Sequence, residues 1–318
     1  AKLAACTPGD LHYTVFASGG SEAVDIAIKS ARRYTGHRKI VAMASGYHGH
    51  TGLAGCAGDD GNARYFGSDQ PGEFTKVPFN DLDAMHAALR GRDVAAVILE
   101  TIPATYGFPV PADDYLPGVA RLCRDYGALY IADEVQTGLG RTGWLWGVDA
   151  WGVQPDILVT GKGLSGGLYP IAATVLSRDV GAWLKDNAWG HVSTFGGAEP
   201  GCVVAARVLD LCSDPATLAH VTRMSDHLYA GLDDMRSRLG FIKEIRRKGV
   251  VMGLVFDSPA GGLEMMSALY QCGIWAIVAG FDRAALQFKP GLLIDQAYAD
   301  ETLSRFESAL RAVKARHR

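Results

Sequence analysis

The sequence lacks any apolar run of membrane-spanning length, because glycine, proline or charged residues interrupt every apolar stretch. It also lacks a surplus of one charge: 31 Lys and Arg residues face 34 Asp and Glu residues, the net charge is −3, and the two signs are interleaved. A polyanionic partner such as a nucleic acid is therefore not indicated. Cysteine is sparse, since the six scattered residues include no C-x-x-C pair, which favours reduced thiols. We expect a soluble, cytoplasmic protein that binds neither nucleic acid nor membrane.

Short, β-prone apolar runs alternate with helical patterns up to residue 214, which predicts an α/β fold with a mainly parallel sheet and right-handed crossovers. The predicted strands are 13–17, 39–43, 94–99, 129–132, 156–160 and 171–176, and the predicted helices begin near 18 and span 81–89, 115–126 and 202–211. Residues 58–71 are polar and rich in glycine, which predicts a loop.

The composition changes after residue 214. Beyond this point the predicted strands are 242–255, 274–279 and 285–294, and the predicted helices are 263–272 and 300–313. We therefore predict two domains, a large domain at 1–214 and a smaller α+β domain at 215–318.

Two predicted strands end in residues that carry chemistry. Asp133 directly follows the run 129–132, and Lys162 stands between two glycines after the run 156–160. In an open parallel sheet the ligand crevice lies at the carboxyl ends of the strands, so both side chains are candidates for one site. A lysine amine can form an imine with a carbonyl ligand, and an aspartate suits a protonated pyridine nitrogen. The pair indicates pyridoxal phosphate, although either residue alone is more often solvated or ion-paired.

Other candidates also stand at segment ends. Gly20 and Ser21 open the helix after the first strand, where free N–H groups and the helix dipole suit a phosphate, although a plain Ser-capped helix accounts for them equally well. Tyr47 stands in a glycine-rich loop and suits an aromatic wall for a flat ring. Glu100 follows an apolar strand and either lines the crevice or is a structural acid. Two histidines flank Gly49, but no third ligand of the right type is nearby, so we predict no metal site.

These motifs resemble those of the class III, fold-type-I pyridoxal phosphate aminotransferases, the group that includes ornithine, 4-aminobutyrate, diamine and ω-amino-acid transaminases. The matching segments are 18–23 (SGGSEA), 47–49 (YHG), 133–138 (DEVQTG), 140–143 (GRTG), 155–157 (PDI), 161–163 (GKG) and 193–197 (STFGG). Any one of them is weak, but together and in this order they are highly specific and cover almost the whole chain.

The resemblance implies a transaminase that moves an amino group from an amine or (ω-)amino acid to a 2-oxo acid, through a lysine Schiff base and a pyridoxamine intermediate. The large domain would bind the cofactor. Lys162 would form the Schiff base and then carry the proton between the substrate carbon and the cofactor. Asp133 would keep the pyridine nitrogen protonated, because a carboxylate raises the proton affinity of that nitrogen.

The same resemblance assigns the remaining cofactor contacts. Gly20 and Ser21 would bind the phosphate, and Thr194 of the partner subunit would reach the same phosphate. A homodimer with its active site at the subunit interface is therefore implied. The implied contacts of the ring are Tyr47 on one face, Val135 on the other face and Gln136 at the 3′-oxygen.

The sequence departs from this family at two places. Members usually carry a substantial segment before the Ser-Gly motif, whereas only a short lead precedes Ser18, so we expect the N-terminal segment of the family to be absent from this chain. Many members also clamp the substrate α-carboxylate with an arginine where this chain has Gln287. A neutral amide cannot offer the charged, bidentate fork of arginine. We therefore predict that carboxylate recognition is weakened or moved to Lys289 or Arg283, and that the donor is an amine or an ω-amino compound.

Two other functions are compatible with these residues. A racemase or decarboxylase would use the same cofactor and scaffold, because the protein decides only which bond breaks and where the proton returns. A catalytically silent homologue would keep the fold without the chemistry, but the presence of Lys162 and Asp133 argues against it. Of these possibilities, only a transaminase must pass through the pyridoxamine form of the cofactor.

Overall fold

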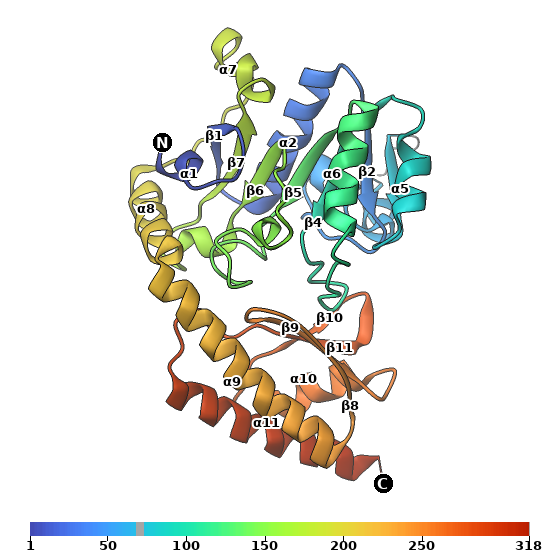
Figure 1. The fold of residues 1–318 in the computed structure, drawn as a ribbon, viewed down its shortest axis with the longest axis vertical. Helices are drawn as coiled ribbons and strands as arrows, with labels where there is room; N and C mark the ends of the chain where they lie inside the picture. The colour runs from blue at the N-terminus through green and yellow to red at the C-terminus, as the bar shows by residue number, and fades with distance from the viewer. Residues whose placement is uncertain (68–72, 318) are drawn as a thin grey trace. The chain divides into compact units, whose positions relative to one another are not determined.

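The computed structural model describes residues 1–67 and 73–317, and the chain forms two compact units (Figure 1). Unit 1 consists of Ala1–Thr101, Pro111–Leu139 and Trp144–Ser213. Unit 2 consists of Ile102–Val110, Gly140–Gly143 and Asp214–Arg318. Two short segments from the first half of the sequence therefore belong to the second unit.

Unit 1 is built on a seven-stranded sheet with the order β1-β7-β6-β5-β4-β2-β3. β2 to β6 pair in parallel, whereas β7 is antiparallel to both of its neighbours, β6 and β1. The central strands are buried along their whole length, as expected for a parallel sheet. The strands are β1 (Leu11–Ala17), β2 (Lys39–Met43), β3 (Phe74–Val77), β4 (Val94–Glu100), β5 (Leu129–Asp133), β6 (Ile157–Thr160) and β7 (Ala172–Ser177).

The helices of unit 1 connect these strands, and α2 (Gly20–Thr35) contributes most to its core. The buried side of α2 includes Val24, Ile28 and Ala31, which repeat at helical spacing and pack in one cluster with the strands. Gly36 ends this helix in the left-handed conformation, with φ of 72°. The other α-helices are α1 (Lys2–Ala5), α3 (Gly52–Ala57), α4 (Asp60–Tyr65), α5 (Leu82–Leu89), α6 (Tyr115–Tyr126), α7 (Trp183–Asp186) and α8 (Glu199–Ser213).

Unit 2 is an antiparallel four-stranded sheet with three long helices. The strand order is β10-β11-β9-β8, with β8 (Ile242–Lys248), β9 (Val251–Phe256), β10 (Ile277–Ala279) and β11 (Asp282–Phe288). The helices are α9 (Pro215–Leu239), α10 (Gly261–Gln271) and α11 (Gln296–Arg316), and their apolar sides form one buried cluster with the strands. Within the described ranges, no helix is at once long enough and apolar enough to pass through a bilayer.

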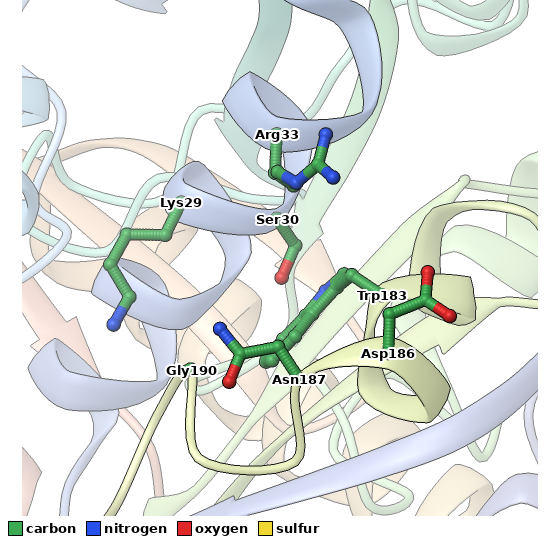
Figure 2. A pocket seen from close by; sticks show the side chains of 7 residues that line it. All are labelled: Lys29, Ser30, Arg33, Trp183, Asp186, Asn187 and Gly190. Atoms are coloured by element: carbon green, nitrogen blue, oxygen red, sulfur yellow. The ribbon is translucent and has the colours of Figure 1, made fainter.

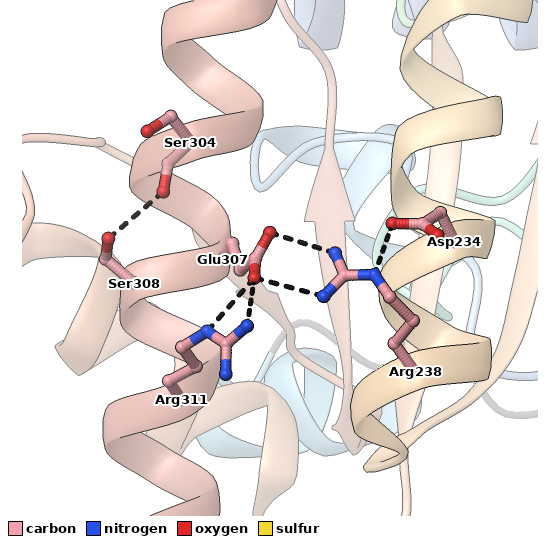
Figure 3. A network of polar contacts seen from close by, with 6 residues as sticks. All are labelled: Asp234, Arg238, Ser304, Glu307, Ser308 and Arg311. Carbon is pink, nitrogen blue, oxygen red and sulfur yellow. Dashed lines mark hydrogen bonds and ion pairs between the residues drawn. The ribbon is translucent and has the colours of Figure 1, made fainter.

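Charged side chains join α9 to α11 on the outside of this cluster (Figure 3). The Arg238 guanidinium on α9 donates to both oxygens of Glu307 on α11, at 3.3 and 3.0 Å, and also to Asp234 at 2.7 Å. Arg311 donates to the same Glu307 carboxylate. These two guanidinium groups lower the pKa of Glu307.

The structure confirms the predicted α/β class and mainly parallel sheet but corrects several elements. The predicted strand 242–255 is two strands, because the chain turns at Gly249 with φ of 59°, where a Cβ would lie 2.4 Å from Arg141 O. The predicted strand 285–294 ends at Phe288, and Pro290 follows in non-strand backbone. The predicted loop 58–71 contains α4, and its part from 68 onward lies outside the described residues.

Helix α9 was not among the predicted elements, although the sequence carries the signals of a helix there. Asp214 caps this helix by accepting from Ala216 N–H at 2.9 Å, and Pro215 occupies the first turn. Leu228, Leu232 and other buried residues then repeat at helical spacing. The change of composition at residue 214 therefore marks the start of a 25-residue helix.

Candidate active site

Three parallel strands deliver the predicted acids and the lysine to one edge of the sheet. The register of β4 and β5 pairs Glu100 with Asp133, so that the two carboxylates stand on neighbouring strands. β6 lies on the other side of β5 and leads through Thr160 and Gly161 to Lys162. The carboxyl ends of β4, β5 and β6 therefore form the edge at which a ligand of a parallel sheet is expected.

Asp133 is held by two donors at the end of β5. Its carboxylate accepts from His48 Nδ1 at 2.8 Å and from Val135 N–H at 3.1 Å. The His48 side chain is fully buried, and its Nε2 has no hydrogen-bond partner among the described residues. Because the carboxylate can only accept, Nδ1 carries the proton of this contact. The geometry thus places a protonated His48 Nδ1 against Asp133 and fixes the orientation of the Asp133 carboxylate.

This role of His48 was not predicted from the sequence, where the two histidines were considered only as metal ligands. No group of three metal-ligating side chains occurs in the part of the chain that the structure describes. The available signal was the position of His48 in the Tyr-His-Gly motif, directly after the expected aromatic wall. The motif alone does not reveal that its partner lies 85 residues further along the chain.

Glu134, which the sequence analysis also missed, anchors the loop that follows Asp133. The Glu134 carboxylate is 1% exposed and accepts four hydrogen bonds. Thr101 Oγ1 (2.6 Å) and Val148 N–H (2.8 Å) donate to Oε1, while Thr137 Oγ1 (2.7 Å) and Gly147 N–H (2.9 Å) donate to Oε2. Burial raises the pKa of Glu134, and the four donors oppose that rise by favouring the charged form. The carboxylate thus joins the end of β4, the loop 134–137 and the segment 147–148.

Lys162 stands in an unusual backbone conformation at the start of the 3-10 helix η2 (Lys162–Ser165). Its φ is +37°, a value that non-glycine residues rarely adopt and that occurs preferentially at functional sites. The side chain is exposed and lines a pocket of about 330 Å³ together with residues 18–20, 165 and 167–171. Gly20 and Lys162 therefore line the same pocket.

The N-terminus of α2 forms the other wall of this site. A Cβ on Gly20 would lie 3.3 Å from Val135 Cγ1, so the helix start and the loop after Asp133 are packed together. A Cβ on Gly49 would lie 1.8 Å from Ser21 Oγ, so only glycine fits between the Tyr47 loop and the helix. The first N–H groups of this 16-residue helix are suited to an anion. The helix start, the lysine and the buried acid fit a flat, phosphorylated ring such as pyridoxal phosphate.

Tyr47 and Glu100, the other predicted side chains near this edge, are connected directly. The backbone N–H of Tyr47 donates to Glu100 Oε1 at 2.9 Å. Tyr47 is 37% exposed, and its ring meets the ring of His50 edge-on, with centroids 5.1 Å apart. Glu100, only 4% exposed, therefore positions the loop that carries Tyr47. Gln136, two residues after Glu134, is half-buried in the described structure.

The loop that carries Thr194 is joined to the first turn of α2 through polar side chains. Glu22 accepts from Ser18 N–H at 2.8 Å and lies 3.4 Å from His191 Nε2. Ser193 Oγ lies 3.4 Å from Ser18 Oγ. Partial burial raises the pKa of Glu22, but the interactions of its carboxylate with Ser18 N–H, Ser193 and His191 outweigh the burial and lower the pKa overall. The adjacent Thr194 side chain is exposed.

The three remaining candidates, Arg283, Gln287 and Lys289, belong to unit 2 and are described within it. Arg283 is exposed at the start of β11, whereas Gln287 is buried in this strand with 7% exposure. Lys289 Nζ donates to Gln287 Oε1 at 2.7 Å, which ties the amide to a cation two residues further on. The amide that replaces the expected arginine is therefore paired with a neighbouring positive charge.

Comparison with known proteins agrees with this geometry. An uncharacterized aminotransferase of Archaeoglobus fulgidus is 43% identical over 315 residues, which cover 99% of this chain and 74% of the relative. The acetylornithine aminotransferase of Neisseria meningitidis serogroup A is 35% identical, over 95% of this chain and 77% of the relative. The crystal structure of a transaminase from the marine bacterium Virgibacillus superposes with a TM-score of 0.93 at 26% identity, over 100% of this chain and 79% of that chain.

The family model of class III aminotransferases matches residues 1–310. Amino donors and 2-oxo acids are the substrates of this family, and pyridoxal phosphate is its cofactor. The comparisons do not favour a racemase or a decarboxylase. The chain therefore belongs to the class III aminotransferases and is a pyridoxal-phosphate-dependent transaminase of fold type I.

Proposed function

We propose that transamination takes place at the ends of β4, β5 and β6, with Lys162 and Asp133 as the catalytic residues. The observation that carries this assignment is the buried pair of Asp133 and His48 at 2.8 Å, one strand away from the exposed lysine. When bound, pyridoxal phosphate supplies the electron sink for the bond that is broken at the amino donor. Lys162 Nζ is the group that takes and returns the proton of the donor carbon. Asp133, fixed by His48 and Val135 N–H, holds the proton of the ring nitrogen.

The other residues of this edge would hold the cofactor in place. The first N–H groups of α2 and the Ser21 hydroxyl would bind its phosphate, because helix N-termini attract anions. Tyr47 would cover one face of the ring and Val135 the other, and Gln136 would reach its 3′-oxygen. Packing of Val135 against Gly20 supports a narrow slot for a flat ring.

The test is an absorbance titration of the purified chain with pyridoxal phosphate, followed by an amino donor alone. We expect a visible band that is lost when the donor converts the cofactor into its amine form. Lys162→Ala should lack this band, with Lys185→Ala, a variant of an exposed lysine on α7, as the matched control. A normal band in Lys162→Ala contradicts the assignment of the lysine, and a band that never bleaches contradicts transamination at this site.

We propose that the donor is an amine or an ω-amino compound. The support is Gln287, whose neutral amide occupies the position of the expected carboxylate-binding arginine and is engaged by Lys289 at 2.7 Å. Any carboxylate contact is then made by a single ammonium, Lys289, or by the exposed Arg283. The measurement is kcat/KM for an amine and for glutamate: comparable values support the proposal, and strict dependence on an α-carboxylate contradicts it. Gln287→Arg should raise kcat/KM for α-amino acids relative to amines by at least about tenfold.

We also propose a homodimer, in which Thr194 of the partner subunit reaches the cofactor phosphate. The exposed apolar side chains around this residue support an interface: Trp189 is 84% exposed, Val192 62% and Phe195 65%. Sedimentation of the wild type should give twice the mass of the chain. Phe195→Asp should shift it toward the monomer, whereas Tyr65→Asp, at a still more exposed aromatic residue of α4, should not. A monomeric, fully active wild type contradicts this proposal.

We assign the cofactor to the large domain, 1–214, and substrate recognition in part to the smaller domain, 215–318. All the proposed cofactor contacts belong to unit 1, whereas Gln287 and Lys289 belong to unit 2, which supports this division. We propose a cytoplasmic location, which is supported by the six scattered cysteines and the lack of any C-x-x-C pair. Fractionation of cells that produce the untagged protein tests this location.

A further inference from the structure

A second pocket lies in unit 1 among residues of α2, α7 and the turn after α7 (Figure 2). Its volume is about 240 Å³, which suits a small metabolite rather than a drug-sized ligand. Seven residues line it: Lys29, Ser30, Arg33, Trp183, Asp186, Asn187 and Gly190. Of these, none belongs to the proposed catalytic or cofactor-binding set.

The wall of this pocket is rich in hydrogen-bond donors. Ser30 Oγ and Trp183 Nε1 are buried, and neither has a hydrogen-bond partner in the described part of the chain. Buried donors without an acceptor are uncommon, because each loses its hydrogen bonds to water without a replacement. Asn187 adds an amide to the same wall (Figure 2). A ligand that offers acceptors would complement this surface.

Two positive charges stand one turn apart on the α2 side of the pocket. Arg33 is exposed, and its guanidinium makes no hydrogen bond or ion pair with any residue in 1–67 or 73–317. Lys29 Nζ lies 3.0 Å from His191 Nδ1, and because an ammonium has no lone pair, the ring nitrogen accepts this hydrogen bond. A neutral acceptor leaves the charge of Lys29 in place. Asp186 is the single acid of the lining, so the pocket carries a net positive charge.

The indole of Trp183 gives the pocket a flat, rigid wall. Trp183 is partly buried and packs against the core cluster of unit 1. Gly190 fits against the edge of this ring, since a Cβ there would lie 2.9 Å from Trp183 Cζ3. An aromatic face beside two cations suits the apolar body of a ligand whose charged group is an anion.

We propose that this pocket is a binding site for a small organic anion, a carboxylate or phosphate monoester on a planar body. Lys29 and Arg33 bind the anionic group, and Trp183 contacts the planar body. The site is separate from the catalytic edge, so that it can be tested by binding alone.

The experiment uses the cofactor-loaded enzyme, labelled with 5-fluorotryptophan and titrated with benzoate. The fluorine signal of Trp183 is assigned by its loss in Trp183→Phe, which distinguishes it from the five other tryptophans. We expect this signal to shift with benzoate. Half of the shift should require at least a tenfold higher concentration of benzamide, the neutral analogue. Phenyl phosphate, titrated in the same way, decides whether the preferred group is a carboxylate or a phosphate monoester.

Charge variants give the controls. Arg33→Met should weaken benzoate at least tenfold, because it removes a charge-assisted hydrogen bond. Asp186→Asn should tighten the binding of benzoate, because it removes the single negative charge of the lining. Since this effect has the opposite sign to that of Arg33→Met, a general loss of folding is excluded as the cause. Three results would each overturn the proposal: an affinity for benzoate that is unchanged in Arg33→Met, equal shifts with benzoate and benzamide, or no shift of the Trp183 signal. The last result includes the case in which a second copy of the chain covers the pocket.

Discussion

Replacing Glu134 by glutamine tests whether its four hydrogen bonds hold the loop after Asp133. Each carboxylate oxygen accepts one threonine hydroxyl and one backbone N–H. In Glu134→Gln, one oxygen becomes an NH₂ group of nearly the same size. The threonine hydroxyl that faces it can rotate and accept, but the backbone N–H of Gly147 or Val148 cannot. Whichever way the amide is turned, one buried backbone donor loses its acceptor.

The expected cost follows from these contacts. An unsatisfied buried N–H costs about 1–3 kcal/mol, and the loss of charge assistance in the remaining hydrogen bonds adds about 1 kcal/mol. We therefore expect Glu134→Gln to lower the free energy of unfolding by about 2–4 kcal/mol. Thr137→Val removes one rotatable donor and leaves Glu134 three partners, so its cost should be about 1 kcal/mol.

The assay is thermal unfolding of the cofactor-free protein, because a bound cofactor would shift the midpoint by mass action. Unit 1 contains about 200 residues, for which the predicted loss corresponds to a fall in Tm of about 5–15 °C for its transition. Thr137→Val, measured in parallel, should fall by much less. A Glu134→Gln midpoint within about 2 °C of the wild type, or above that of Thr137→Val, would refute the role of Glu134 as an anchor.

Three further predictions concern other charged contacts. His48→Ala should weaken the binding of pyridoxal phosphate about 10–100-fold in a spectral titration, because Asp133 loses a charge-assisted donor. His48→Asn keeps an N–H near the position of Nδ1 and should retain most of the affinity. An equal loss of affinity in both variants contradicts this prediction. Burial lowers the pKa of Lys76 to about 8 from the ordinary 10.5, so the unfolded chain binds more protons than the folded chain between these two pH values. The stability of the wild type relative to Lys76→Met should therefore rise from pH 8 to pH 10.5. A difference in urea midpoint between the two proteins that does not change with pH would count against this prediction. The pKa of Glu307 is lowered, so its contribution to stability is present above the ordinary 4.5 and is lost as pH falls through the folded-state pKa. Glu307→Gln should therefore lower Tm more at pH 7 than at pH 3, and a difference that is as large at pH 3 as at pH 7 would show that the ion pair with Arg238 is not its cause.

Local patterns in the sequence were sufficient for much of this protein. Apolar runs of strand length and helical repeats predicted most elements of unit 1, and they placed Asp133 and Lys162 at strand ends, because each pattern depends on residues that are close in the chain. The error at 242–255 arose in the same way: strand-like patterns on both sides of Gly249 do not show that this residue reverses the chain to fit beside Arg141.

Only the tertiary structure decided which side chains meet. His48 and Asp133 are 85 residues apart, and their contact depends on the strand order that brings the Tyr47 loop to the end of β5. The donors of Glu134 come from three separate segments, and residues 102–110 join the second unit although they follow a strand of the first. Such pairings depend on the strand register and on the crossover connections, and the same local patterns are compatible with many strand orders. The sequence by itself thus determined the elements and the chemistry available, and packing decided which groups hold the catalytic acid.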